Sequence, residues 1–335
     1  MNQSERSLIS AGLYGLLIGD AVGRPYEFKL PKEIPAFDDI CMTPPQGYDS
    51  TFPYVPFGTW TDDGAQALAL LDSLIQCNGL DLDHFSLCLC NWYKQGKYTP
   101  DRVVFDCGIQ TSSALDSILS GTPILEASGR DDYSNGNGSL MRTLSVALYE
   151  RVSIENMIKI ALNQGIPTHA HPRSAVACAI YCLMARHLIH EGTYIDPDTA
   201  SKSLYGYLDS EQKAELDHIL ASPFRDNPKG SGYVVDTLWS VHFAMEADNY
   251  RDVIRNAILL GDDTDTTAAI AGGLAGLKYG YDGLPKDWLC ALKGKEQVAS
   301  VLNQLFDNAG SLLEGKRGSK PTNEQSDPDR LYAKN

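Results

Sequence analysis

The segment Thr266–Tyr279 is apolar on every face that a helix could present. It consists mainly of alanine, isoleucine, leucine and glycine, and Lys278 is its one charged residue. A helix that is apolar all round is buried inside a larger group of helices. The rest of the chain is therefore expected to pack around this segment.

Most of the remaining chain repeats apolar residues at helical spacing, and strand alternation is scarce. In Ser7–Val22, Gly12, Gly15 and Gly19 form a face without side chains, which predicts close contact with another helix. We expect an all-α fold, a single compact orthogonal bundle of about ten or more helices over residues 1–314. The polar residues 315–335 are expected to be a disordered tail. Further helices are expected at about 63–77, 82–95, 107–120, 141–149, 154–163, 174–190, 198–220, 233–247, 250–260 and 298–313.

The formal net charge of −15 over 335 residues disfavours binding to nucleic acid and to anionic membranes. The eight cysteines form no C-x-x-C pair, the polar N-terminus does not read as a signal peptide, and no apolar run reaches membrane-spanning length. We therefore expect a cytoplasmic protein with free thiols, and a monomer.

Two acidic clusters, far apart in the chain, each stand directly before an apolar helical run. One is Thr61-Asp62-Asp63 and the other is Asp262-Asp263-Thr264-Asp265-Thr266. Helix capping explains either cluster alone. However, a cap needs one such residue, and adjacent carboxylates repel one another unless a cation neutralises them. Hard oxygen donors suit Mg²⁺, Mn²⁺ or Ca²⁺ better than zinc. If the clusters meet, they predict a site for two divalent cations.

Other polar segments have a simple structural explanation when each is taken alone. Glu27 lies in a loop, and Asp106 stands where it could cap a helix. The Gly-rich loop at Asn137-Gly138-Ser139 could hold a phosphate but lacks the lysine of a P-loop. His169 and His171 would not share a helix face, which disfavours a zinc pair.

Taken in order, these segments resemble the pattern of the ADP-ribosylglycohydrolase family, including the dinitrogenase reductase-activating glycohydrolases. The resemblance spans roughly residues 8 to 280, and its strength lies in seven short motifs in the same order. They are Gly19-Asp20-Ala21-Val22-Gly23, Glu27, Thr61-Asp62-Asp63, Asp106-Cys107-Gly108, Asn137-Gly138-Ser139-Leu140-Met141-Arg142, Thr168-His169-Ala170-His171-Pro172 and Gly261-Asp262-Asp263-Thr264-Asp265-Thr266.

This resemblance implies an all-α hydrolase with two Mg²⁺ or Mn²⁺ ions. It implies Glu27, Asp62 and Asp106 as catalytic residues, with Glu27 a mobile acid or base and Asp106 near the leaving group. It places Asn137, Gly138, Ser139 and His169 along the ADP-ribose cleft, and Asp262 at a variable position outside the ligand set. The implied metal ligands are Thr61, Asp62, Asp63, Asp263, Asp265 and Thr266.

The implied reaction is hydrolysis of the glycosidic bond between ADP-ribose and an acceptor, with arginine favoured over serine because of Asp106. The substrate would be an ADP-ribosylated protein or a small-molecule ADP-ribose adduct. Two other classes stay open: a non-catalytic ADP-ribose-binding or structural member of the fold, and a binuclear-metal phosphohydrolase. A role in immunity to an ADP-ribosylating toxin is equally compatible with the residues.

Overall fold

Every regular element is a helix in residues 1–151 and 153–317, the part of the chain that the computed structural model describes. One antiparallel bridge, between Gly136 and Tyr233, is the only sheet-like pairing within those residues. The predicted all-α fold is therefore confirmed. The α-helices are α1 (Gln3–Gly23), α2 (Asp62–Cys77), α3 (Leu82–Gln95), α4 (Ile109–Leu119), α5 (Leu144–Tyr149), α6 (Ile154–Asn163), α7 (Pro172–Glu191), α8 (Pro197–Ser201), α9 (Ser210–Leu220), α10 (Val234–Ala244), α11 (Tyr250–Leu259), α12 (Thr264–Tyr279), α13 (Lys286–Ala291) and α14 (Lys295–Arg317).

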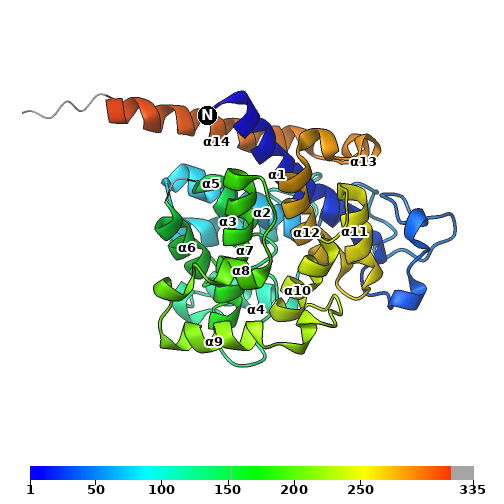
Figure 1. Cartoon of the computed structure of the whole chain (residues 1–335), viewed down its shortest axis with the longest axis horizontal. Coiled ribbons are helices and arrows are strands. Elements are labelled where there is room, and N and C mark those ends of the chain that lie inside the picture. The colour runs from blue at the N-terminus through cyan, green and yellow to red at the C-terminus, as the bar shows by residue number, and fades with distance from the viewer. Residues whose placement is uncertain (152, 318–335) are drawn as a thin grey trace, which may run out of the picture.

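Helix α12 is the buried central helix that the sequence predicts, and α1 lies directly against it (Figure 1). Glycines allow the two backbones to touch: a Cβ on Gly15 would collide with the carbonyl of Gly272, and one on Gly19 with that of Ala268. The glycines therefore cost helix propensity but permit this close contact. Its consequence is that the C-terminal end of α1 reaches the N-terminal end of α12.

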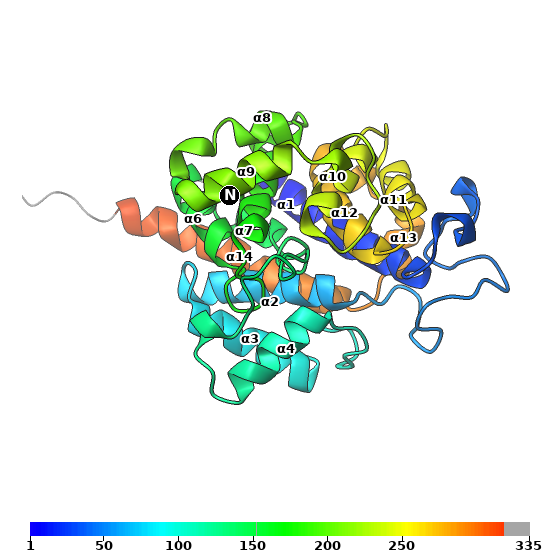
Figure 2. The ribbon, with the colours of Figure 1, turned by 90° about the horizontal axis from the view of Figure 1, so that it is seen from below.

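The other helices surround this pair. Seen from below, α2, α3 and α4 lie together on one side, and α6 to α9 and α10 to α12 occupy the other (Figure 2). The connection between α1 and α2 projects beyond the helices near α11 and contains three short 3₁₀ turns, Arg24–Tyr26, Pro31–Glu33 and Phe37–Asp39. The long irregular connection predicted at residues 23–60 is present.

Three expectations differ from the structure. The single helix expected at 198–220 is wrong: α8 and α9 are separate, because Asp209 and Gln212 form a capping box that starts a new helix. Helix α13 was not predicted. Helix α14 ends at Arg317, so residues 315–317 of the expected tail are helical and residues 318–335 lie outside the described part. Among the described residues, no helix is long and apolar enough to cross a membrane.

Candidate functional site

The first acidic cluster begins helix α2 and is held by a carboxylate from α1. Thr61 is the N-cap residue of α2, with Asp62 and Asp63 in the first turn. Both carboxylate oxygens of Asp20 accept hydrogen bonds from the backbone N–H of Thr61, at 2.9 and 3.0 Å, and one also accepts from that of Gly64, at 2.8 Å. Asp20 therefore satisfies N–H groups that the start of a helix leaves unpaired.

The second cluster begins helix α12 and packs against the same end of α1. The Thr264 hydroxyl donates to the carbonyl of Gly23, at 2.9 Å. A Cβ on Gly23 would lie 2.5 Å from the Cα of Asp265, so a side chain at position 23 would push Asp265 away. This close approach brings the second cluster to the first.

The two clusters meet in the interior. The Thr266 hydroxyl donates to Oδ2 of Asp63 at 3.4 Å, and the Thr61 hydroxyl donates to the same oxygen at 3.0 Å. Carboxylate oxygens of Asp20, Asp63 and Asp265 all lie within 4.8 Å of one another. The structure thus brings together residues that are far apart in the sequence.

A second group of three carboxylates adjoins the first. Oxygens of Glu27, Asp106 and Asp265 lie within 4.8 Å of one another, so Asp265 belongs to both groups. Asp106 is not the helix cap that its position in the sequence allowed, because α4 begins after Gly108. Glu27 is buried directly after the 3₁₀ turn Arg24–Tyr26.

Burial and mutual repulsion make these carboxyl groups hard to ionise. Burial raises the pKa of Asp62 to about 6 and that of Asp20 to about 7, although backbone hydrogen bonds oppose both shifts. Burial, then neighbouring carboxylates, raise the pKa of Asp106 to about 8 and that of Glu27 to about 10. The same two causes raise the pKa of Asp63 and of Asp265 well above the ordinary value. A bound cation would favour the ionised form of these carboxyl groups and would therefore lower their pKa values.

The donor set fits hard divalent cations. Oδ1 of Asp63 and Oε2 of Glu27 are buried and have no hydrogen-bond partner among the described residues. Unpaired buried carboxylate oxygens are unfavourable unless a cation or proton meets them. Asp20 differs, because both of its oxygens already accept backbone N–H groups. We therefore regard Asp20 as a support for the cluster, although its oxygens lie close enough to the others to be ligands.

Two further predicted ligands are engaged by amide side chains. Oδ2 of Asp62 accepts from Nε2 of Gln66 at 3.4 Å, and Oδ2 of Asp263 accepts from Nδ2 of Asn137 at 2.7 Å. Asp262 is exposed with a φ of 58°, and its backbone N–H and carbonyl pair with Lys29 and Phe28. Its side chain takes no part in either carboxylate group.

The Gly-rich loop lies next to the acidic cluster and presents free backbone donors. Asn137 joins the two, since its side chain also donates to the Thr237 hydroxyl at 3.0 Å. The described residues offer no hydrogen-bond partner to the backbone N–H groups of Gly138 and Ser139. The Ser139 side chain is fully buried and accepts a weak hydrogen bond from Cys178. Successive unpaired N–H groups form an anion-binding concavity, so at Ser139 the backbone is the available binding group.

The two histidines of the Thr-His-Ala-His-Pro segment have different positions. A Cβ on Gly138 would lie 2.5 Å from Cε1 of His169, so this ring lies over the Gly-rich loop. Burial, with a further contribution from Arg142, lowers the pKa of His169 to about 3, and the ring is neutral at pH 7. His171 instead caps α7, where Nδ1 accepts from the backbone N–H of Arg173 at 3.1 Å.

Sequence reasoning assigned no role to two buried residues that support the site, Asp20 and Arg142. Both belong to the motifs that carry the resemblance, and that membership was the available signal. Their functions depend on contacts with residues distant in the chain, which spacing does not reveal. Both side chains are fully buried.

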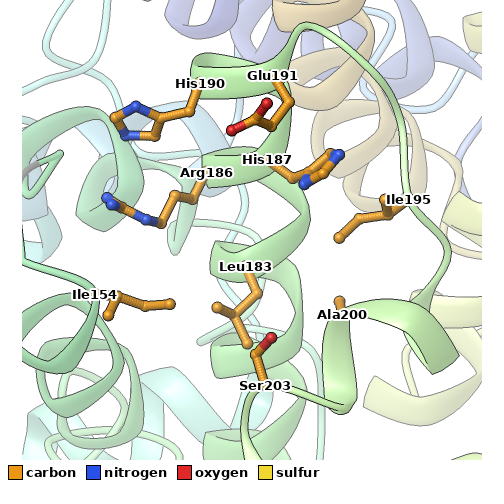
Figure 3. A pocket seen from close by; sticks show the side chains of 9 residues that line it. All are labelled: Ile154, Leu183, Arg186, His187, His190, Glu191, Ile195, Ala200 and Ser203. Atoms are coloured by element: carbon orange, nitrogen blue, oxygen red, sulfur yellow. The ribbon is translucent and has the colours of Figure 1, made fainter.

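A separate cavity of about 290 Å³ lies beside the C-terminal half of α7 and contains none of the predicted site residues (Figure 3). Nη1 of Arg186 and Nε2 of His190, which line it, both lie within hydrogen-bond distance of the carbonyl of Arg151. Nε2 of His187 lies 3.0 Å from the Thr193 hydroxyl. These groups are committed to local structure, so the cavity is not a candidate for the chemistry of the acidic cluster.

Comparison with known proteins agrees with the motifs. A family model described as ADP-ribosylglycohydrolase matches residues 1–315. The ADP-ribosylarginine hydrolase Tri1 of Serratia proteamaculans is 31% identical over 309 residues, covering 88% of this chain and 77% of that protein. The ADP-ribosyl-[dinitrogen reductase] glycohydrolase of Rhodospirillum rubrum is 29% identical over 300 residues, covering 88% and 94%.

The fold also matches a solved structure, described as an ADP-ribosylglycohydrolase-related protein complex. Its TM-score is 0.72 at 24% identity, with coverage of 92% of this chain and 100% of that chain. The resemblance inferred from the motifs is therefore confirmed. The chain belongs to the ADP-ribosylglycohydrolase family and is a hydrolase of glycosyl bonds.

Proposed function

We propose that this protein removes ADP-ribose from modified arginine side chains in a reaction that depends on two divalent cations, Mg²⁺ or Mn²⁺. The observation that carries the proposal is the pair of carboxylate groups that share Asp265. Two adjacent groups of carboxylate oxygens with one common member bring hard donors close together, which supports a site for two divalent cations.

The cations would be held by Asp63 and Asp265, with Asp62, Asp263 and the hydroxyls of Thr61 and Thr266 completing the ligand set. When bound, they would supply positive charge that positions the ribose hydroxyls and a water molecule. Their charge would also allow the surrounding carboxyl groups to ionise at neutral pH. Asp20 would keep the first turn of α2 in place through its backbone hydrogen bonds.

Glu27 and Asp106 would act at the scissile bond. Loss of the acceptor gives the ribose carbon oxocarbenium character, which a nearby carboxylate stabilises. Glu27 is the proposed acid or base, because one of its oxygens is buried and unpaired beside this position. Asp106 is partly exposed at the edge of the cluster, where it would hold the positively charged guanidinium as it leaves. A carboxylate there favours arginine over an uncharged acceptor.

The diphosphate would be bound by neutral donors. The free N–H groups of Gly138 and Ser139 support this role, and the ring of His169 lies against the same loop. Asn137 would connect the diphosphate to the cation site through its hydrogen bond with Asp263. Such a site binds an anion without a basic surface, which agrees with the net charge of −15.

The substrate would be an ADP-ribosylated protein or a small-molecule ADP-ribose adduct, acted on by a monomer in the cytoplasm. Two relatives are named for arginine-linked ADP-ribose and for ADP-ribosylated dinitrogen reductase, which supports a protein substrate here. Nucleic acid and membranes are not proposed as partners, because the acidic surface disfavours both.

A panel of defined ADP-ribosyl linkages, with arginine, serine and small-molecule acceptors, tests the proposal when assayed with Mg²⁺, with Mn²⁺ and with EDTA. We expect free ADP-ribose from the arginine linkage, and no turnover in EDTA. AMP with ribose phosphate would instead indicate the phosphohydrolase. Tight ADP-ribose binding without hydrolysis of any linkage would indicate a non-catalytic member of the fold.

A further inference from the structure

Arg142 is fully buried, yet all the hydrogen bonds of its guanidinium go to uncharged oxygens. Nε donates to Oε1 of Gln164 at 2.9 Å, and Nη1 donates to Oε1 of Gln66 at 2.7 Å. Nη2 donates to the carbonyl of Gln164 at 3.2 Å and to the Thr168 hydroxyl at 2.9 Å. Burying a charge without a paired carboxylate is costly, which indicates a functional role for the arginine.

The hydrogen bond from Arg142 to Thr168 determines which atom accepts the hydroxyl proton of Thr168. Among the described residues, Oγ1 of Thr168 has two side-chain partners, Nη2 of Arg142 and Nδ1 of His169, each at 2.9 Å. Arginine can only donate, so the hydroxyl accepts from Arg142. The hydroxyl is fully buried, and its own proton then has one acceptor available, Nδ1 of His169.

A neutral imidazole that accepts at Nδ1 carries its proton on Nε2. The reverse arrangement, with Nδ1–H donating to Thr168, would leave the buried hydroxyl proton without an acceptor. We infer that Arg142, acting through the hydroxyl of Thr168, fixes His169 as the Nε2–H tautomer, so that the ring presents an N–H donor to an anionic ligand beside Gly138. Arg142 and Thr168 are thus positioning residues for His169.

Nε2 of His169 lies next to the Gly-rich loop, where it could donate to a bound anion. A Cβ on Gly138 would lie 2.8 Å from Nε2, and one on Gly136 would lie 3.6 Å from it. Nε2 has no hydrogen-bond partner among the described residues. It is also not one of the unpartnered side-chain atoms that are fully buried, so it keeps some exposure. It therefore remains available to a ligand, next to the unpaired N–H groups of Gly138 and Ser139.

Arg142 also contributes to keeping the His169 ring neutral. Burial is the main cause that lowers the pKa of His169, and the nearby guanidinium adds to it. An imidazole held neutral gives one donor in a fixed position over a wide pH range. The identity of the acceptor, a phosphate oxygen of ADP-ribose, rests on the proposed function, whereas the tautomer does not.

Nitrogen-15 NMR of the full-length protein at pH 7 tests the tautomer directly, with the His169 signals identified by their loss in His169→Gln. We expect a protonated Nε2 and an unprotonated Nδ1 in the wild type. Thr168→Val removes the hydroxyl and should change the Nδ1 signal, whereas Thr168→Ser should restore it. A protonated Nδ1 in the wild-type protein would overturn the inference.

Calorimetric binding of ADP-ribose adds a functional readout. Thr168→Val should weaken binding about tenfold, the effect expected for a poorly oriented hydrogen bond to a charged group. Thr267→Val is the matched control, since the Thr267 hydroxyl is buried without a partner in the described structure, and it should bind ADP-ribose as the wild type does. Equal affinity of folded Thr168→Val and wild type would overturn the role of the Nε2–H group as a donor to ADP-ribose, whereas the NMR measurement decides the tautomer.

Arg142→Lys serves as a second variant if Thr168→Val does not fold. Lysine keeps the charge but lacks the fork that reaches Gln66, Gln164 and Thr168 together, so the Nδ1 signal should change in the same direction. If no ADP-ribosyl linkage is hydrolysed while ADP-ribose affinity still falls in Thr168→Val, the proposed function fails and the positioning of His169 by Thr168 is supported.

Discussion

Asp20, near the end of α1, accepts hydrogen bonds from the backbone N–H of Thr61 through both of its carboxylate oxygens, at 2.9 and 3.0 Å. One helix thereby caps the start of another. Because α1 also touches α12 through glycine contacts, the same short part of α1 fixes the starts of both helices that carry the acidic clusters.

Asp20→Ala should lower the free energy of unfolding by about 2 kcal/mol or more, since it leaves buried N–H groups of Thr61 and Gly64 without an acceptor. Urea denaturation in EDTA at pH 6 measures this. The control is Asp248→Ala, whose carboxylate is exposed and makes no hydrogen bond in the described structure, and it should change stability by less than about 0.5 kcal/mol. Equal effects of the two substitutions would show that Asp20 is not a supporting residue.

Gly138→Ala should weaken ADP-ribose binding about tenfold or more, because the new methyl group would meet the ring of His169, which Thr168 holds in place. Isothermal titration calorimetry checks the affinity. At Gly206 an added Cβ would meet no atom within 4 Å, so Gly206→Ala is the matched control and should bind normally. Unchanged affinity in Gly138→Ala would place the ligand elsewhere.

In EDTA, the protein should lose stability as the pH rises from 7 to 9. The folded-state pKa values of Asp106 (about 8) and Glu27 (about 10) exceed the unfolded values near 4, so in this window the folded state binds more protons than the unfolded state. The stability that these two groups contribute is therefore fully present below about pH 4. It is lost as the pH rises towards and through their folded-state pKa values. Each group can contribute up to about 1.4 kcal/mol per pH unit.

The pH window matters because His169 acts in the opposite direction at lower pH. Its folded pKa is about 3, so it adds stability as the pH rises through its unfolded value near 6.5, and its contribution is nearly constant above pH 7. Denaturation curves at pH 7, 8 and 9, with EDTA and with Mg²⁺, separate the effects. We expect Mg²⁺ to remove most of the loss. Stability that rises with pH in EDTA would contradict the pKa shifts.

Asp106→Asn should reduce kcat on ADP-ribosyl-arginine by about a hundredfold or more, the range seen when a group that stabilises charge in the transition state is lost. The affinity for ADP-ribose should change much less, because Asp106 is not among the groups proposed to bind the diphosphate. Asp101→Asn, at an exposed carboxylate of the same loop, is the matched control and should keep its turnover. An unchanged kcat in Asp106→Asn would remove its proposed role at the leaving group.

The helices could be predicted because their apolar periodicity is local. The segments expected at 82–95 and 154–163 coincide with α3 and α6. The prediction fails at 198–220, where the charged pattern continues across a break that the capping box of Asp209 and Gln212 creates. The short helix α13 has too few turns to show a period.

The sequence predicted the residues of the site that stand in recognisable motifs, but not the contacts between distant segments. The two acidic clusters and the Gly-rich loop stand out in the sequence, and the structure places them together. The support from Asp20 and the hydrogen bonds of Arg142 depend on distances between segments that the sequence does not encode locally. Asp106 is a similar case. Its position before a helix suggested a helix cap, and only the fold shows that it lies beside Glu27 and Asp265.

The binding of Mn²⁺ to the wild type and to Asp265→Asn, measured by calorimetry and followed by the hydrolysis assay, tests the two-cation site most directly. Asp262→Asn is the matched control, since Asp262 is exposed and asparagine tolerates its positive φ. We predict two Mn²⁺ ions in the wild type and in Asp262→Asn, and loss of both tight binding and hydrolysis in folded Asp265→Asn. Two ions bound by Asp265→Asn with wild-type affinity, or full wild-type activity in EDTA, would contradict the account.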